Sequence, residues 1–292
     1  MRNLRLLKRG LVKSLQDPFQ EVEEKPPYLE RIMQKPEPAI RYAMFFTPRS
    51  GSSRLTDICD QSGVLSKPGE IFNWNFMPGI AAHYGARDMA TYIDVIARDR
   101  NTNGVFGCQQ TYMHILAGFR STGKWRAAVK PTHYFWLYRE DIVAQAVSIS
   151  RMRQTRIGHA NSVSQGQQET AERDFTYRQG SILGIIEFIQ FMEAGSEAFF
   201  RRTSTRPMRL SYERVSDLSA DEVVAVLAGG IGIEPSGAAA ITERHTKMTG
   251  SKASEFTARF RRENQRFIRK IDRARRNMIT QLDDMPVSYP RK

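Results

Sequence analysis

The most constraining stretch of this sequence is residues 42–63, where a short apolar run, a turn of small polar residues and an amphipathic run follow one another. Residues 43–46, Ala-Met-Phe-Phe, are long enough for one buried strand, and Pro48 ends it because proline has no N–H to donate. From Leu55 on, apolar residues recur at helical spacing, and Gly63 predicts the end of that helix. The stretch therefore predicts a strand, a tight loop and a helix in immediate succession.

The loop at residues 48–53 reads Pro-Arg-Ser-Gly-Ser-Ser and has the composition of an anion-binding turn. A helix start leaves backbone N–H groups unpaired and carries a partial positive charge, and both attract an anion. Gly51 permits a close backbone approach, and Arg49 adds a fixed charge. The loop is not a Walker A sequence, which needs two spaced glycines and a lysine before serine or threonine. It predicts a phosphate site, and on the local pattern alone the alternative is a serine-rich turn that caps an ordinary helix.

The same residues resemble the 5′-phosphosulfate loop of sulfotransferases that use 3′-phosphoadenosine 5′-phosphosulfate (PAPS), in particular the bacterial trehalose 2-sulfotransferase family. Further matching segments extend from about residue 42 to about residue 262. The resemblance implies a P-loop-like α/β fold and PAPS as the donor, with no metal ion. The residues that it assigns to the 5′ end of the donor are Arg49, Ser50, Gly51, Ser52 and Ser53, and it also gives Arg49 a catalytic role.

A second matching segment, residues 139–148, directly follows an aromatic strand predicted at residues 134–138. The resemblance implies that Arg139, at the end of this strand, and Ser148, in the following helix, bind the 3′-phosphate of the donor. An arginine at a strand end beside a helix N-terminus is also a phosphate site on general grounds. The alternative is a surface ion pair between Arg139 and Asp141.

Glu70 lies one predicted helix beyond the loop, in a Pro-Gly-Glu-Ile-Phe segment at residues 68–72. The segment resembles the family's acidic loop, which implies that Glu70 is the catalytic base. Partial burial among the neighbouring apolar side chains would raise the pKa of Glu70 toward that of a useful base. The alternative is an exposed glutamate beside a turn, and His83 and His133 are then the next candidate bases.

Two aromatic residues near Glu70, Phe72 and Trp74, are candidates for binding the acceptor, because aromatic rings stack on sugar faces; core packing is the alternative. Residues 103–107 match an Asn-Gly-Val-aromatic-Gly stretch of the family, but Gln-Gln-Thr follows where a lysine is expected. Farther on, an arginine-rich segment resembles the family's C-terminal segment, and either Arg259 or Arg261 is its candidate contact with the nucleotide.

Short apolar segments at residues 43–46, 105–108, 134–138 and 208–211 alternate with helical patterns. This alternation predicts an α/β fold with a mostly parallel central sheet flanked by helices on both faces. Ligands should then lie at the carboxyl ends of the strands, where both arginines of the expected donor site project. The expected helices include a long one at residues 168–200 and a basic one at residues 262–278.

The chain shows no break large enough for two separate cores, and we divide it into three parts. Residues 1–38 combine a basic N-terminal helix with a proline-rich linker, residues 39–262 form the sulfotransferase-like domain, and residues 263–292 form a basic C-terminal helical extension. Residues 1–15 carry five cations without an acid, and their leucines fall at helical spacing. They predict either a helix packed on the domain or a basic amphipathic helix on an anionic membrane surface.

A net charge of +13 predicts an anionic partner, such as a nucleotide, nucleic acid, anionic lipid or acidic glycan. The two cysteines both lie in apolar segments and make neither a disulfide framework nor a metal site, which fits a cytoplasmic setting. No apolar run is long enough to span a bilayer, and the N-terminus lacks the apolar core of a signal peptide.

Together these features predict sulfuryl transfer from PAPS to a carbohydrate hydroxyl of a glycan or glycolipid, of trehalose or lipopolysaccharide type. The alternative is a non-catalytic basic protein that binds a nucleotide or nucleic acid, with its charge and its aromatic rings gathered on one face. A kinase is disfavoured because the loop lacks the lysine that P-loop kinases need. The resemblance also suggests a homodimer, and a glycolipid acceptor would place the enzyme peripherally on the inner face of the cytoplasmic membrane.

Overall fold

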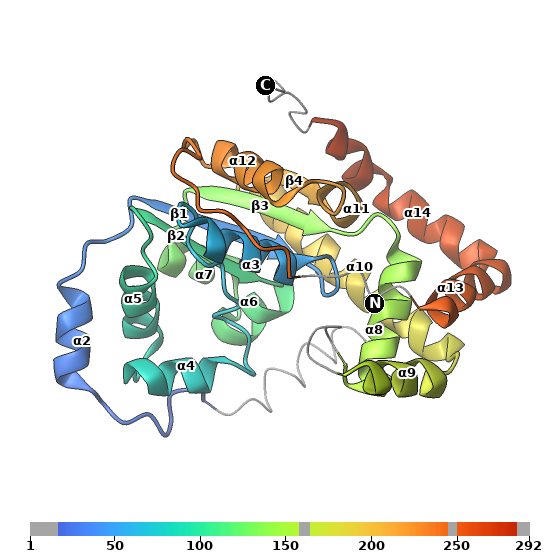
Figure 1. Ribbon diagram of the computed structural model, residues 1–292, viewed down its shortest axis with the longest axis horizontal. Helices are drawn as coiled ribbons and strands as arrows, with labels where there is room; N and C mark the ends of the chain where they lie inside the picture. Colours follow the sequence, from blue (N-terminus) through green and yellow to red (C-terminus); the bar gives the residue numbers. More distant parts are fainter. Residues whose placement is uncertain (1–16, 158–163, 245–249, 285–292) are drawn as a thin grey trace.

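The computed structural model describes residues 17–157, 164–244 and 250–284. Its centre is a sheet of four parallel strands in the order β2-β1-β3-β4 (Figure 1). The strands are β1 (Ile40–Phe46), β2 (Val105–Gln110), β3 (His133–Tyr138) and β4 (Met208–Ser211). The predicted α/β class with a parallel sheet is confirmed, and every strand covers the apolar segment from which it was predicted.

Both faces of the sheet are buried, because alternate residues of each strand point to opposite sides. In β1, Tyr42 and Met44 face one hydrophobic cluster, while Ala43 and Phe45 face the other. The first cluster is covered by α3 (Ser52–Ser62), α11 (Tyr212–Val215) and α12 (Ala220–Gly230). The second is covered by α4 (Met77–Tyr84), α5 (Met89–Asp99), α6 (Tyr112–Phe119), α7 (Thr122–Val129) and α10 (Gln179–Arg202), with α2 (Pro26–Met33) packed on α5.

A third hydrophobic cluster lies at the end of the molecule toward which the strands point. It is formed by helices that Figure 1 shows together on the right, apart from α2, α4 and α5 on the left. These helices are α8 (Ile142–Thr155), α13 (Ser251–Glu263) and α14 (Gln265–Thr280), together with residues 182–192 of α10. Helix α9 (Gln165–Asp174) adjoins the cluster through Phe175, which directly follows it, and the short 3₁₀ helix η2 (Gln281–Asp284) follows α14. The arrangement puts a helical layer beyond the carboxyl ends of β1 and β3.

Two predicted helices are each divided in the structure. The segment at residues 168–200 breaks after α9, where Phe175 adopts an extended backbone and buries its ring 5.0 Å from that of Phe256. The basic segment at residues 262–278 breaks at Asn264, whose side-chain amide donates to the carbonyl oxygen of Phe260 at 3.0 Å. In both places a specific tertiary contact or cap interrupts a pattern that is helical on either side.

Within the described residues, no helix is long and apolar enough to cross a membrane. The same residues contain no group of His, Cys, Asp and Glu side chains that could hold a metal ion. The basic helix predicted at residues 1–15 lies outside the described residues, so the choice between its two interpretations stays open.

Candidate functional site

A cavity of about 1180 Å³, here called the main cavity, lies at the carboxyl ends of β1 and β3. The loop after β1, the turn after β3, and helices α3, α8, α11 and α13 line it. This is the place that the parallel-sheet prediction gave for a ligand. The predicted site residues that line it are Arg49, Ser50, Gly51, Ser52, Ser53, Glu70, Arg139 and Ser148.

The loop between β1 and α3 has an unusual backbone. Arg49 and Gly51 both have left-handed conformations, with φ values of 65° and 86°. Gly51 is the N-cap of α3, and no side chain caps this helix. The interpretation of the loop as a serine-rich capping turn is therefore wrong, and the first N–H groups of α3 keep the capacity to bind an anion.

Buried hydrogen bonds hold the loop in this shape. The side-chain amide of Gln145, on α8, donates to the hydroxyl of Thr47 at 2.8 Å and to the carbonyl oxygen of Pro48 at 2.7 Å. Within the loop, the hydroxyl of Ser50 donates to the carbonyl oxygen of Thr47 at 2.7 Å. Because that hydroxyl is already engaged and buried, Ser50 offers a ligand its backbone rather than its side chain.

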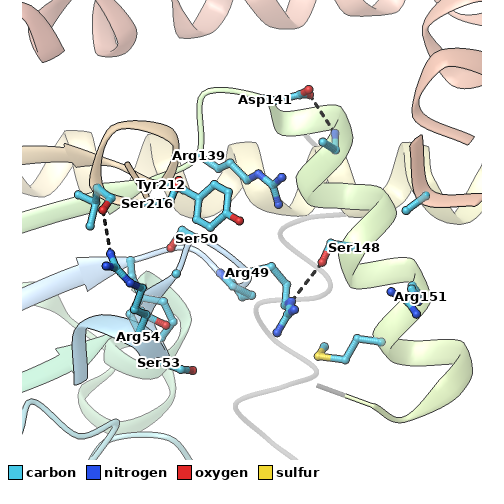
Figure 2. Close-up of a pocket in the computed structure, with 18 of the residues that line it drawn as sticks. Arg49, Ser50, Ser53, Arg54, Arg139, Asp141, Ser148, Arg151, Tyr212 and Ser216 are labelled. Atoms are coloured by element: carbon cyan, nitrogen blue, oxygen red, sulfur yellow. Dashed lines mark hydrogen bonds between the residues drawn. The ribbon is translucent and has the colours of Figure 1, made fainter. Parts of the chain in front are cut away.

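Of the arginines that line the main cavity, three come from the loop after β1, the end of β3 and α8: Arg49, Arg139 and Arg151. Figure 2 shows Arg49 directed at α8, where its Nε donates to the hydroxyl of Ser148 at 3.2 Å. Burial lowers the pKa of Arg49, and the positive charges of Arg139 and Arg151 lower it further. An anion bound among these groups would offset both effects.

Arg139 lies over the ring of Tyr212, with 4.4 Å between the guanidinium carbon and the ring centroid (Figure 2). Its Nε is 3.4 Å from a carboxylate oxygen of Glu213. Asp141 instead accepts from Arg261 at 2.7 Å and caps α8, so the predicted alternative of an Arg139–Asp141 pair is wrong. The Nε atoms of Arg139 and Arg151 are buried and make no hydrogen bond within the described residues. Both side chains are nevertheless in ion pairs, Arg139 with Glu213 and Arg151 with Glu172, whose oxygen lies 3.2 Å from Nη2 of Arg151.

Glu70 lines the main cavity as a half-buried carboxyl group. Burial raises its pKa, and a hydrogen bond from the Asn73 side-chain amide, at 2.8 Å, partly opposes that rise. The alternative of an exposed glutamate beside a turn is therefore wrong, and the raised pKa that a general base needs is present.

The candidate replacement bases lie elsewhere. His83 contacts Tyr28. His133, the first residue of β3, contacts Thr132. Neither histidine lines the main cavity. Among the described histidines, the one that lines it is His114, whose Nδ1 accepts from the backbone N–H of Thr111. Burial lowers the pKa of His114 to about 4, so this side chain is neutral near pH 7.

Neither aromatic candidate for the acceptor lines the main cavity. Phe72 is fully buried, with its ring 5.2 Å from that of Phe119, and Trp74 packs against the same core. The prediction that Phe72 binds the acceptor is wrong, because its ring has no exposed face. The exposed aromatic residue of this segment is Phe76, at 53% exposure, and it lines a second, shallower cavity.

This second cavity, here called the side hollow, has a volume of about 420 Å³. It shares Glu70 and Asn75 with the main cavity, so the two meet at the candidate base. The other residues that line the side hollow are Ile71, Phe76, Gly79, Ile80 and Arg100.

Several cavity residues were not predicted from the sequence. Arg151 lines the cavity three residues after Ser148, and this spacing on α8 was a signal that could have indicated it. Gln145, three residues before Ser148, does not line the cavity but holds the loop after β1. Of the two C-terminal candidates, Arg261 lines the main cavity. Arg259 points away to Tyr177 and Glu263.

The comparison with protein families agrees with this geometry. A family model described as Stf0 sulphotransferase matches residues 41–263, which include every residue that lines the main cavity. No curated protein shows a significant match to the sequence. Because the family model covers well over half of the 292 residues, the chain belongs to the Stf0 sulphotransferase family.

Proposed function

We propose that this sulfotransferase takes its sulfuryl group from PAPS and transfers it to a hydroxyl group of a carbohydrate, in a glycan or glycolipid of trehalose or lipopolysaccharide type. The observation that carries the proposal is the convergence of Arg49, Arg139 and Glu70 on one cavity. A donor with phosphate groups at two ends needs cations at two places, and the acceptor hydroxyl needs a base. The main cavity, at about 1180 Å³, exceeds the usual size of a single small-molecule site, about 300–1,000 Å³.

The chain's own groups fit the donor. Arg49 and the uncapped N–H groups of α3 suit the 5′-phosphosulfate, and Arg139 with Ser148 suits the 3′-phosphate. Arg49 and Ser148 are hydrogen-bonded to each other, so we expect the donor to take over this contact when it binds. Arg151, which also pairs with Glu172, adds a third cation on the same wall.

In the reaction, the acceptor oxygen bonds to sulfur while the bond from sulfur to the bridging phosphate oxygen breaks, and that oxygen keeps the electron pair as 3′,5′-adenosine bisphosphate leaves. Glu70 receives the proton of the attacking hydroxyl, and Asn73 fixes the orientation of its carboxylate. Arg49 and the N–H groups of α3 stabilise the negative charge that develops on the leaving phosphate. Positioning and charge stabilisation supply most of the rate, as in phosphoryl transfer.

We place the acceptor on the side of Glu70 that faces the side hollow. Phe76 offers an exposed aromatic face to the apolar side of a sugar ring, and Asn75 offers an amide to its hydroxyl groups. A sugar bound there has one hydroxyl next to Glu70, where the two cavities meet.

Thermal stabilisation distinguishes this function from the non-catalytic alternative. We expect 3′,5′-adenosine bisphosphate to raise the Tm, and a single-stranded oligonucleotide of equal phosphate concentration to have little effect. The reverse result would favour a nucleic-acid-binding protein, whose affinity would also fall steeply with salt.

The acceptor is tested directly with sulfur-labelled PAPS and a panel of trehalose, other sugars and lipopolysaccharide. Transfer to at least one carbohydrate, lost in Glu70→Gln, is the expected result. Donor binding without transfer to any carbohydrate would contradict the acceptor class but leave the donor assignment standing.

A further inference from the structure

We propose that Arg275, on the C-terminal helix α14, is a positioning residue for the donor site, because it fixes the turn that carries Arg139. The inference rests on the proposed function, in which Arg139 binds the 3′-phosphate. It concerns a part of the chain, α14, that begins after the last residue matched by the family model.

The contacts of Arg275 are specific and buried. Its Nη1 donates to the carbonyl oxygen of Glu140 at 2.8 Å, and its Nη2 donates to that of Arg139. Its Nε and Nη2 also donate to the two carboxylate oxygens of Glu193, on α10, at 2.9 and 2.8 Å. Both side chains of this ion pair are only 5% exposed.

The same turn is held from its other side by Glu213. Its carboxylate accepts from the backbone N–H of Glu140 at 2.8 Å and from that of Asp141 at 3.3 Å. In residues 139–141, here called the β3–α8 turn, Arg275 therefore fixes the carbonyl groups of the first two residues, and Glu213 fixes the N–H groups of the last two. The Arg139 side chain leaves the backbone directly before the carbonyl group that Arg275 holds and the Glu140 N–H group that Glu213 holds.

Two further hydrogen bonds tie the C-terminal segment to the same edge of the sheet. The hydroxyl of Tyr138, the last residue of β3, donates to the carbonyl oxygen of Met278 at 2.7 Å. Arg214 donates to the carbonyl oxygen of Leu282, in η2, at 2.8 Å. Helix α14 thus sets the position of the strand end as well as of the turn.

Stability alone is a poor explanation for a buried ion pair of this kind. Desolvating two charges is costly, and replacing such a pair with apolar residues of similar volume is often neutral or stabilising. A pair of apolar side chains cannot donate hydrogen bonds to two consecutive carbonyl groups, as the rigid, planar guanidinium of Arg275 does. The geometry points to placement of Arg139 as the role of the pair.

The test compares 3′,5′-adenosine bisphosphate with adenosine 5′-monophosphate, which lacks the 3′-phosphate, by calorimetry. The variant is the double replacement Glu193→Leu/Arg275→Met, which removes both charges and keeps the core filled. We expect its Tm to stay near or above that of wild type, and its affinity for the bisphosphate to fall about 10- to 100-fold, as for a misplaced binding group. Affinity for the monophosphate should be unchanged, and the KM for PAPS should rise with kcat nearly kept.

The chain offers a matched control and a reference. Glu197 lies one turn along α10 from Glu193 and pairs with Arg209, but this pair makes no described hydrogen bond to the β3–α8 turn. Glu197→Leu/Arg209→Met should therefore leave the preference for the bisphosphate intact. Arg139→Ala, which removes the positioned group itself, should give the same selective loss as the Arg275 variant or a larger one.

Unchanged affinity for the bisphosphate in the Glu193→Leu/Arg275→Met variant would overturn the proposal, and so would an equal loss for both nucleotides. If the double variant does not fold, Arg275→Lys is used, because a single ammonium keeps the charge pair but cannot hold both carbonyl groups. It should show a smaller loss of the same selectivity, and full retention of selectivity would overturn the proposal. If wild type itself binds neither nucleotide, the donor assignment fails instead.

Discussion

At the scale of single residues, the environment of Glu70 departs from what a purely structural role requires. A half-buried carboxyl group with no cation paired to it is costly to ionise, and the only described group that offsets this is the amide of Asn73. The arrangement keeps a base of raised pKa at the junction of two cavities. Function explains this cost better than folding does.

We expect Glu70→Gln to lower kcat by about 10²–10⁴-fold, the usual cost of removing a general base, while the Kd for the donor stays nearly unchanged. Glutamine keeps an oxygen that can accept from Asn73, so the local structure should survive. Initial rates with labelled PAPS and calorimetry with 3′,5′-adenosine bisphosphate measure the two effects. A variant that retains more than about a third of wild-type turnover would contradict the assignment, and His114 would then be the histidine to examine.

The same variant has a stability effect whose sign follows from the raised pKa. The folded protein holds the Glu70 proton more tightly than the unfolded chain does, because the pKa of Glu70 in the unfolded chain has the ordinary value of 4.5. The contribution of Glu70 to stability is therefore present below pH 4.5 and is lost as pH rises through the raised pKa of the folded state. Glu70→Gln should match or exceed the wild-type Tm at pH 7 and show no gain in acid.

Wild-type kcat/KM should fall in acid with an apparent pKa above 4.5.

Phe76 supplies a second prediction at this scale. Phe76→Ala should raise the KM for the carbohydrate acceptor by about tenfold, because it removes a stacking contact of the kind that is worth about 1–3 kcal/mol for a nucleobase on an aromatic ring, and should leave donor binding unchanged. Met33→Ala is the matched control, because Met33 is the other large apolar side chain exposed in the described residues, at 41%, and lies on α2 away from both cavities. Equal acceptor kinetics in Phe76→Ala and wild type would rule out the side hollow as the acceptor site.

At the scale of elements, the two ends of α3 allow a controlled test of the loop. Gly51 and Gly63 both have positive φ, 86° and 67°, and cap the two ends of this helix. A Cβ on Gly51 would lie 3.0 Å from the ring of Tyr212, whereas a Cβ on Gly63 would meet nothing within 4 Å. Alanine costs about 1–2 kcal/mol at either position through backbone strain, but only at Gly51 does it press on the ring beneath Arg139.

We therefore expect Gly51→Ala and Gly63→Ala to lower the Tm by similar amounts, and only Gly51→Ala to weaken binding of 3′,5′-adenosine bisphosphate. Differential scanning fluorimetry and calorimetry on the two variants supply the comparison. Equal donor affinity in both would mean that the loop and Tyr212 do not act on the donor together.

The elements near the site were predictable from sequence to different degrees. The strands were predicted because a short apolar run bounded by turn residues is typical of a buried strand. The loop was predicted because Pro48 ends the strand and Gly51 permits the left-handed backbone of the turn. Phe72 and Phe76 differ in burial although both are aromatic, because two successive tight turns, at residues 70–73 and 73–76, redirect the chain between them. The pairing of Arg275 with Glu193 joins residues 82 positions apart, and such a contact has no local signal.

At the scale of the whole molecule, the positively charged side chains fall into groups with different surroundings. Some cations are engaged in the main cavity, and others lie on the exposed face of α14, including Arg266, Arg269 and Arg273. The apolar face of α14, with Ile268, Ile271 and Met278, is already buried in the protein. A helix in this position has charge to offer an anionic membrane surface but no apolar side to insert. In the sequence of residues 1–15, both features are present: five cations and a stripe of leucines at helical spacing.

We therefore propose that the full chain binds anionic membranes through residues 1–15 rather than through α14. Each cation near such a surface contributes about 1 kcal/mol, so five give a useful and reversible affinity that salt screens. Deletion of residues 1–16 should abolish sedimentation with vesicles rich in anionic lipid, and leave the Tm and the turnover of soluble carbohydrate acceptors unchanged. The control, Arg266→Gln/Arg269→Gln/Arg273→Gln on α14, should still sediment at low salt. Should the deletion instead lower the Tm by several degrees, the segment packs on the domain; should only the α14 variant lose binding, α14 is the membrane-facing helix.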